Sequence, residues 1–193
     1  MQSIPSNYPS KTPPGDLAIW IFIVAELLVF AVFFASYAFT RRDHIELFNQ
    51  WQPLLDRDLA LINTLALISG SYCVVRALSA MRDNHSKATH LWLVAAIVTG
   101  LMFVVIKSIE YRHLYQQGFN LRSNVFFMFY FSLTFFHFMH VIMAMIILAA
   151  NAVKTRAGHY SADNMTGLHT GASYWHMVDL VWIILFPLVY VMH

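Results

Sequence analysis

Two histidines lie three positions apart in the almost wholly apolar stretch Tyr130–Met145 (YFSLTFFHFMHVIMAM). At this spacing His137 and His140 share one side of a helix, where they could bind one metal ion or reach a neighbouring helix. A metal site needs three or four converging ligands, and a heme with two axial histidines would take the second from a facing helix, with His176 as the candidate. Structural hydrogen bonding between helices is the alternative.

Acidic and basic side chains also occur inside apolar stretches, where each one costs energy unless it has a partner or a purpose. Glu26, in IFIVAELLVFAVFF, has no cationic neighbour one helical turn away. It is predicted to be either a protonated acid bonded to another helix or a proton-handling carboxyl. Lys107 and Glu110, in VVIKSIEYRHLY, are three residues apart and can neutralise each other on one helix face.

The last apolar stretch, YWHMVDLVWIILFPLVY, carries His176 and Asp179 three residues apart. This spacing predicts an imidazole–carboxylate hydrogen bond, which would serve as a structural clamp or as part of a proton relay. Small and polar residues in LINTLALISGSY are typical of close contacts between membrane helices. The predicted packing residues are Asn63, Thr64, Ser69 and Ser71.

The composition indicates a membrane protein. Hydrophobic residues make up 59% of the 193 residues and charged residues only 11%, against about 25% charged in a typical soluble domain. A net charge of +2 without a basic run gives no support for binding nucleic acid. Cys73 is the single cysteine, which excludes a disulfide framework and CxxC redox chemistry.

About 20 apolar residues cross a bilayer as a helix, and five stretches meet this requirement. They are residues 17–40, 59–81, 91–113, 125–153 and 174–192. We therefore predict an all-α integral membrane bundle of five transmembrane helices over residues 17–193. Residues 1–16 contain four prolines and no apolar core, so they are predicted to form a flexible N-terminal segment rather than a signal peptide.

The connections carry further signals. Asp58 is placed to cap the second helix, and KTRAGHYSADNMTGLHTG reads as the longest loop because it holds three of the seven glycines. Lys and Arg are divided almost evenly between the two sides of the predicted bundle. Charge alone therefore leaves the orientation in the membrane open.

Five segments resemble, in order, the helices of subunit III of the heme–copper oxidases: FIVAELLVFAVFFASY, LINTLALISGSY, IKSIEY, HFMHV and YWHMVDLVWIILFPLVY. The resemblance covers nearly the whole chain and places the family's buried polar residues at Glu26, Glu110, His137, His140, His176 and Asp179. Long members have seven helices, and this chain resembles the last five, as in short bacterial members. Phe136, Phe138 and Met139 stand where many oxidase members have glycines, which favours the subunit-III-like protein associated with nitric oxide reductase.

The resemblance implies a non-catalytic accessory subunit that holds no cofactor or metal of its own. Heme, with copper or non-heme iron, would lie in the catalytic partner, and phospholipid would bind between helices. The chain would support the assembly, stability and proton environment of that partner in a bacterial inner membrane, with its N-terminus in the cytoplasm and its C-terminus in the periplasm. Neither the electron donor, quinol or cytochrome c, nor the acceptor, oxygen or nitric oxide, can be read from this chain.

Two other functions are consistent with the residues. One is a heme- or metal-binding membrane electron carrier that uses His137, His140 and His176. The other is a small proton channel or transporter centred on Glu26.

Overall fold

Five long helices dominate the computed structural model, which describes residues 17–192. They are α1 (Leu17–Asp43), α3 (Arg57–Arg82), α4 (Ser86–Gln116), α5 (Val125–Arg156) and α6 (Thr166–Phe186). Each belongs to a helical stretch that is long and apolar enough to cross a membrane. Within the described residues there is no β-strand, only a single bridge between Ser161 and Asn164. The predicted all-α membrane fold is confirmed, while the segment 1–16 lies outside the described residues.

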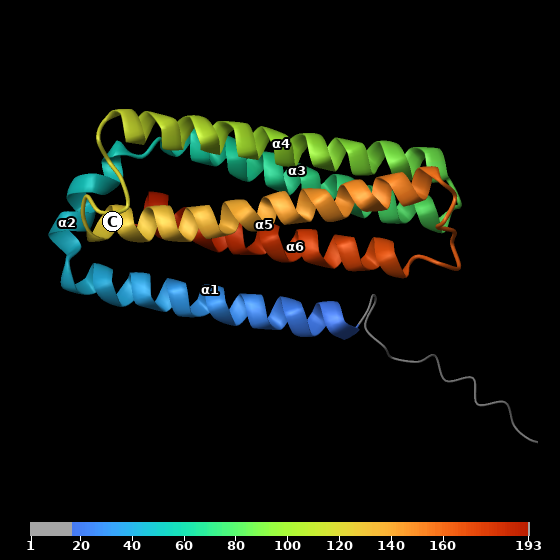
Figure 1. Cartoon of the computed structure of the whole chain (residues 1–193), viewed down its shortest axis with the longest axis horizontal. Helices are drawn as coiled ribbons and strands as arrows, with labels where there is room; N and C mark the ends of the chain where they lie inside the picture. Colours follow the sequence, from blue (N-terminus) through green and yellow to red (C-terminus); the bar gives the residue numbers. More distant parts are fainter. Residues whose placement is uncertain (1–16, 193) are drawn as a thin grey trace, which may run out of the picture.

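The long helices run alternately up and down, so that each is antiparallel to the next along the chain (Figure 1). α3 and α4 form a tight helical hairpin, α5 packs beside α4, and α6 contacts both α3 and α5. The α3–α4 turn is closed by Asn84, whose φ of 56° lies in the left-handed region that asparagine tolerates, and by the His85 amide, which donates to the Ala80 carbonyl at 2.8 Å. These four helices form the core of the bundle.

α1 runs along the outside of this four-helix core (Figure 1). Only 11% of its most apolar stretch is buried, against 56% for the stretch that includes α6. Its buried apolar residues are Ile23, Phe30 and Tyr37, spaced seven apart, so α1 presents one narrow seam to its neighbours. Most of its surface is left for lipid or for another protein.

Short helical segments close the end of the bundle at which the chain finishes (Figure 1). They are α2 (Ile45–Trp51), the 3₁₀ turn η1 (Gln52–Leu54) and the π-helical segment η2 (Pro187–Val191). The fully buried Phe48 ring of α2 meets the rings of Tyr37 and Phe126 edge to face, and these contacts hold the short helix under the long ones.

The fourth connection is shorter than the sequence suggests, because α6 begins at Thr166 and the loop covers only residues 157–165. Two of the glycines that read as loop signals lie inside α6. The Gly167 carbonyl accepts a 3.0 Å hydrogen bond from Asn151 Nδ2, and a Cβ on Gly171 would collide with the same amide. Gly171 lets α6 approach α5 closely, and Gly167 leaves room for Tyr160 of the α5–α6 loop. Gly158, with a φ of 76°, does form the turn.

The N-terminus of α3 is capped by a different residue from the one expected. Asp56, not Asp58, is the capping residue, and its carboxylate accepts from the Leu59 amide at 3.0 Å. The helix begins at Arg57, two residues earlier than predicted, which brings Asp56 rather than Asp58 to the position that can reach the third amide of the helix.

Candidate functional site

The most deeply buried charged group is Lys107, in the C-terminal half of α4. Its side chain is fully enclosed, and Glu110, one turn further on, is almost as well buried. Lys107 Nζ donates to Glu110 Oε2 at 2.9 Å. The predicted local pairing is therefore present, and two further side chains extend it.

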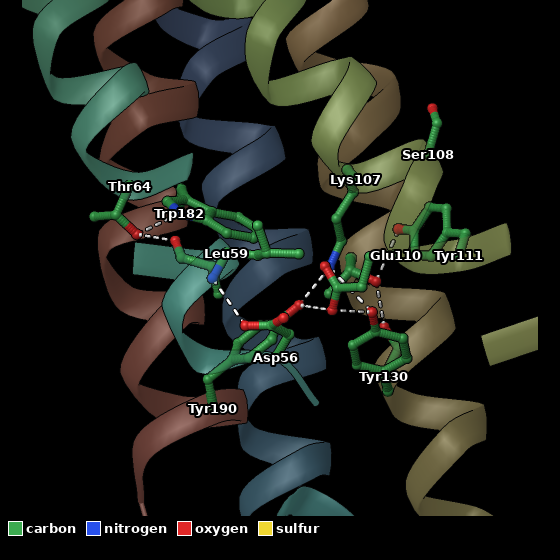
Figure 2. Close-up of polar contacts among 12 residues, drawn as sticks. Asp56, Leu59, Thr64, Lys107, Ser108, Glu110, Tyr111, Tyr130, Trp182 and Tyr190 are labelled. Atoms are coloured by element: carbon green, nitrogen blue, oxygen red, sulfur yellow. Dashed lines mark hydrogen bonds and ion pairs between the residues drawn. The ribbon is translucent and has the colours of Figure 1, made fainter. Parts of the chain in front are cut away.

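Two tyrosines complete this arrangement, which we call the Lys107 cluster (Lys107, Glu110, Tyr130 and Tyr190). The Lys107 ammonium also donates to the hydroxyls of Tyr130, at 3.1 Å, and Tyr190. Both hydroxyls in turn donate to Glu110 Oε1, at 2.6 and 2.8 Å. All three ammonium protons and both carboxylate oxygens are thus used, and Figure 2 shows the four side chains converging from α4, α5 and η2.

Aromatic rings enclose the ammonium group. Its nitrogen lies 4.9–5.6 Å from the ring centroids of Tyr111, Tyr130, Tyr190 and Trp182. A buried ion pair is tolerated when its remaining hydrogen-bonding capacity is satisfied, and cation–π contacts add to this. The Lys107 cluster is a closed, neutral link rather than an open ligand site.

The cluster also fixes the end of the chain. Tyr190 belongs to η2, whose Val189 carbonyl accepts a hydrogen bond from Gln52 Nε2 at 2.9 Å. The carbonyl of Met192, which directly follows η2, accepts one from Arg41 Nη2 at 2.7 Å. η2 is therefore tied to η1, α4 and α5, and the residue that follows it is tied to α1. These bonds use carbonyls that the end of a helix would otherwise leave unpaired.

A small cavity of about 290 Å³ reaches the edge of Glu110 from outside the bundle. Its walls come from η1, the start of α3 and the end of α4, and they include Asp56 and His113. Both Glu110 oxygens are already engaged inside the protein, so the carboxylate presents little free bonding capacity to this cavity.

Glu26 makes a second ion-pair contact, between α1 and α5. Its Oε2 lies 3.1 Å from His140 Nε2, and the two side chains are 20% and 11% exposed. Glu26 has no cationic neighbour one turn away on its own helix, and its partner comes from a helix more than a hundred residues later in the chain. Phe30 and Phe136 both pack edge to face against the imidazole.

The protonation of this pair follows from its geometry. His140 Nδ1 lies 2.7 Å from the Phe136 carbonyl, which can only accept, so Nδ1 carries a proton. The contact between Nε2 and Glu26 then needs one more proton, held either by the carboxyl or by the imidazole. The pair is neutral overall in both cases.

His137 turns away from His140. Its Nε2 donates to the Val178 carbonyl of α6 at 3.0 Å, and its ring packs against Phe103 and Trp182. The two histidines therefore serve different neighbours, α6 and α1, instead of converging on one ion. A spacing of three leaves them about 60° apart around the helix axis, which is enough to aim them at separate helices.

His176 and Asp179 do not bond to each other as the sequence predicts. Ser71, on α3, lies between them: its hydroxyl donates to Asp179 Oδ2 at 2.6 Å and lies 3.3 Å from His176 Nδ1. The serine predicted as a packing residue thus bridges two side chains of α6. Asp179 is buried and His176 half-buried.

The other predicted packing residues separate into two groups. Thr64 accepts a 2.9 Å hydrogen bond from Trp182 Nε1, and Asn63 is fully buried. Ser69 lies on the exposed side of α3, one residue off the buried line formed by Asn63, Leu67, Gly70 and Val74. Among residues 17–192, no hydrogen bond links its hydroxyl to another helix.

Sequence reasoning missed Tyr130, Tyr190 and Asn151. A signal for the tyrosines exists, because a lysine enclosed in a membrane helix needs three acceptors and one glutamate supplies only part of them. Asn151 bonds both to Gly167, as noted above, and to the Tyr160 hydroxyl, at 3.0 Å. Tyr160 lies in the α5–α6 loop, and burial raises the pKa of its phenol above the ordinary value.

Within residues 17–192, no three His, Cys, Asp or Glu side chains form a group that could hold a metal ion. The polar residues instead link pairs of helices: α4 with α5 and η2, α1 with α5, α5 with α6, and α3 with α6. This arrangement defines a polytopic membrane protein whose ionisable groups are engaged in contacts between helices. Comparison with known proteins then identifies the family.

The family model of cytochrome c oxidase subunit III matches residues 15–193. Cytochrome c oxidase subunit 3 of Thermostichus vulcanus is 32% identical over 180 residues, covering 91% of this chain and 86% of the relative. The same subunit of Alkalihalophilus pseudofirmus is 28% identical, covering 99% and 94%, and the probable quinol oxidase subunit 3 of Staphylococcus saprophyticus is 27% identical, covering 91% and 88%.

The chain therefore belongs to the cytochrome c oxidase subunit III family. Subunit III is an accessory subunit of heme–copper oxidases, and the function predicted from the resemblance is confirmed at this level. The two alternatives, a heme-binding electron carrier and a proton channel, gain no support from these comparisons.

Proposed function

We propose that this chain is the non-catalytic subunit III of a respiratory heme–copper oxidase and packs beside a heme-bearing catalytic subunit in the membrane. The observation that carries the proposal is the family match over residues 15–193, which spans all five long helices. The polar contacts support it: they join the helices of this chain to one another. The association with nitric oxide reductase stays a prediction.

In this proposal the redox chemistry belongs to the partner. Heme and copper would be held by the catalytic subunit, and this chain would stabilise the partner and its surroundings. Phospholipid and the partner would share the large apolar surface of the bundle, on which α1 contributes exposed residues such as Leu17, Ile21, Leu28 and Val32.

We place the chain in a bacterial inner membrane with its N-terminus in the cytoplasm. An odd number of spans puts the two ends of the described chain on opposite sides, as Figure 1 illustrates. Lys and Arg occur in nearly equal numbers at both ends of the bundle, so the orientation is proposed from the resemblance to the family and not from charge. Fusion of a periplasm-active reporter to the C-terminus tests this, because a reporter inactive there would reverse the assignment.

The Glu26–His140 pair is proposed to act on the proton environment of the complex. Its proton can reside on either partner, and it lies beside the most exposed helix of the bundle rather than in the closed core. A pair of this kind can take up and release a proton without leaving a net charge in the membrane. The Lys107 cluster has no such freedom, since every donor in it is committed.

Co-purification tests the proposal. An affinity-tagged chain extracted in mild detergent is expected to bring a heme-bearing polypeptide with it, and the heme absorbance should remain with that polypeptide when the two are separated. A Soret band that stays with the isolated chain and disappears in His137→Ala would overturn the accessory function in favour of an electron carrier.

Turnover of the purified complex provides a second test of the proposed function. Removing this chain should leave the initial rate of oxygen consumption nearly unchanged but shorten the period over which activity lasts. Loss of the initial rate from a complex that still holds its heme would show that the chain takes part in the reaction itself.

A further inference from the structure

Ser71 of α3 joins two titratable side chains of α6 into one continuous chain of hydrogen bonds. Its hydroxyl donates to Asp179 Oδ2 at 2.6 Å, and the same oxygen lies 3.3 Å from His176 Nδ1. We call these three side chains the Ser71 bridge (His176, Ser71 and Asp179). The imidazole and the carboxyl group therefore communicate through a hydroxyl, although they make no direct contact.

The Ser71 bridge leads from the surface of the bundle into its interior. Asp179 is only 7% exposed, whereas His176 is half-buried. Leu180, one turn beyond His176 on the same side of α6, is 49% exposed. Within residues 17–192 no hydrogen bond is made to His176 Nε2, and this atom is accessible from outside. The histidine end of the bridge is therefore open, and the aspartate end is enclosed.

The enclosed end is poorly suited to a permanent negative charge. Asp179 Oδ1 is buried and has no hydrogen-bond partner among residues 17–192, so the Ser71 hydroxyl is the one donor that this carboxyl group has there. A buried carboxylate with so few donors costs free energy, and a neutral acid avoids this cost. Asp179 therefore needs a route by which it can gain and lose a proton.

The Ser71 hydroxyl provides this route because a hydroxyl both donates and accepts. In the charged state, His176 Nδ1–H donates to Ser71 Oγ, and the Ser71 hydroxyl donates to the carboxylate. In the neutral state both bonds are reversed: Asp179 Oδ2–H donates to Ser71 Oγ, and the Ser71 hydroxyl donates to Nδ1. The change breaks one N–H and one O–H bond and forms two O–H bonds, so one proton passes from imidazolium to carboxylate.

We propose that Ser71 relays protons between His176 and Asp179, so that this buried acid exchanges its proton with the outer face of α6. Chains of Asp, Glu and His side chains inside membrane proteins commonly carry protons. Because Oδ1 is enclosed and Oδ2 is bonded to Ser71, the bridge is the route to the surface that the described residues offer. It joins α3 and α6, apart from the Glu26–His140 pair, and does not depend on which catalytic subunit the chain accompanies.

Hydrogen–deuterium exchange of the Asp179 carboxyl group, followed by infrared spectroscopy of the full chain in mild detergent, tests the proposal. A ¹³C label on the aspartate carboxyl groups separates them from those of glutamate, and Asp179→Asn should remove the band of the protonated acid. The label alone still identifies this band if that variant does not fold, because the other aspartates of residues 17–192 lie at helix ends or in loops: Asp43, Asp56, Asp58, Asp83 and Asp163.

Ser71→Val and Ser71→Thr form the decisive pair of variants. Both side chains are branched at Cβ and similar in size, and they differ in the hydroxyl group. A positioned proton-transfer group commonly accelerates a transfer by about 100-fold or more, so Ser71→Val should slow the exchange of Asp179 about 100-fold. Ser71→Thr should exchange nearly as fast as the unmodified chain. Equal exchange rates in the two variants would overturn the relay.

His176→Leu tests the outer end of the bridge and decides the question if Ser71→Val does not fold. It should slow the exchange as much as Ser71→Val does, and an unchanged rate would overturn the proposal. Ser69→Val, on the exposed side of the same helix, is the matched control and should leave the rate unchanged. The absence of a protonated aspartate band from the unmodified chain would show that Asp179 stays ionised, and this too would overturn the relay.

Discussion

Two acid–base pairs in this chain, Lys107–Glu110 and Glu26–His140, show how differently a membrane protein can place the same kind of contact. Lys107 and Glu110 lie one turn apart on α4, and two tyrosines from other elements close the contact completely. Glu26 and His140 come from different helices, each has some exposure, and they have one bond to each other. The first pair joins α4 to α5 and η2 in a closed set of hydrogen bonds, and the second is a single contact between α1 and α5.

The difference arises from the helices that carry the pairs. α4 and α5 lie in the four-helix core, where aromatic rings exclude lipid from Lys107 on all sides. α1 contacts the core along a narrow seam, so a charged group on it is shielded by few neighbours. Variants in each of the two regions test this comparison.

The largest effect is expected from Lys107→Met. It leaves the Glu110 carboxylate buried without its cation, and removing one partner of a buried ion pair costs about 3–5 kcal/mol. Unfolding of the purified chain in detergent, followed by loss of helical circular dichroism, should reveal a destabilisation of this size. Lys154→Met, on an exposed position of α5, is the matched control and should change the stability by less than about 0.5 kcal/mol.

A double variant separates the ion pair from the packing. Lys107→Met combined with Glu110→Leu removes both charges, and such replacements are often close to neutral. The double variant should therefore be more stable than Lys107→Met alone. A double variant that loses as much stability as the sum of two damaging single changes would show that the aromatic shell, not charge pairing, controls this region.

Gly70→Val tests the close packing of α3 against α4 and α6 and changes no charged residue. A Cβ at Gly70 would lie 2.5 Å from Thr99 Oγ1 and 2.6 Å from the Trp175 ring, so α3 would have to move away from α4 and α6. Overpacking of this kind costs about 1–3 kcal/mol. Ala25→Val, at an exposed position of α1, adds a comparable volume and should change the unfolding free energy by less than about 0.5 kcal/mol. Equal losses would mean that α1 is packed as tightly as the core.

Tyr190→Phe removes one hydroxyl from the Lys107 cluster and leaves the ring in place. Lys107 loses one acceptor and Glu110 one donor, and a buried group left without its partner costs about 1–3 kcal/mol. Limited proteolysis of the C-terminal segment should accelerate together with this loss, because Tyr190 helps to fix η2. Tyr115→Phe, on the exposed part of α4, should change neither measurement.

The sequence predicts the helices well because hydropathy over 20 residues is a strong signal, and it identifies the ionisable residues because they are rare inside such stretches. It does not predict that α1 lies outside the core, since α1 has the highest hydropathy of the five spans, 2.8. In a membrane, an apolar helix can face lipid as readily as protein, so hydropathy does not rank helices by burial.

The sequence also does not predict which side chains of different helices contact each other. Tyr190 meets Lys107 across 83 residues and Ser71 meets Asp179 across 108, and no local pattern connects them. The glycines of α6 show the same limit: Gly167 and Gly171 look like turn residues until Asn151 is seen against them. Spacing indicates which face a residue occupies, and only the packing shows what that face contacts.

The smallest change in stability is expected from Glu26→Gln, although it alters the chemistry of the pair most directly. The glutamine amide can still donate to His140 Nε2, and one hydrogen bond between membrane helices contributes about 0.6 kcal/mol on average, so the loss of stability should be smaller than this. Infrared difference spectroscopy of the chain should show the proton exchange of a carboxyl or imidazole in the unmodified protein and its absence in the variant. His140→Ala is the companion variant, because it removes the other site for the same proton and should abolish the same signal. A loss of several kcal/mol in Glu26→Gln would contradict the comparison, since it would make this pair a structural link equivalent to the Lys107 cluster.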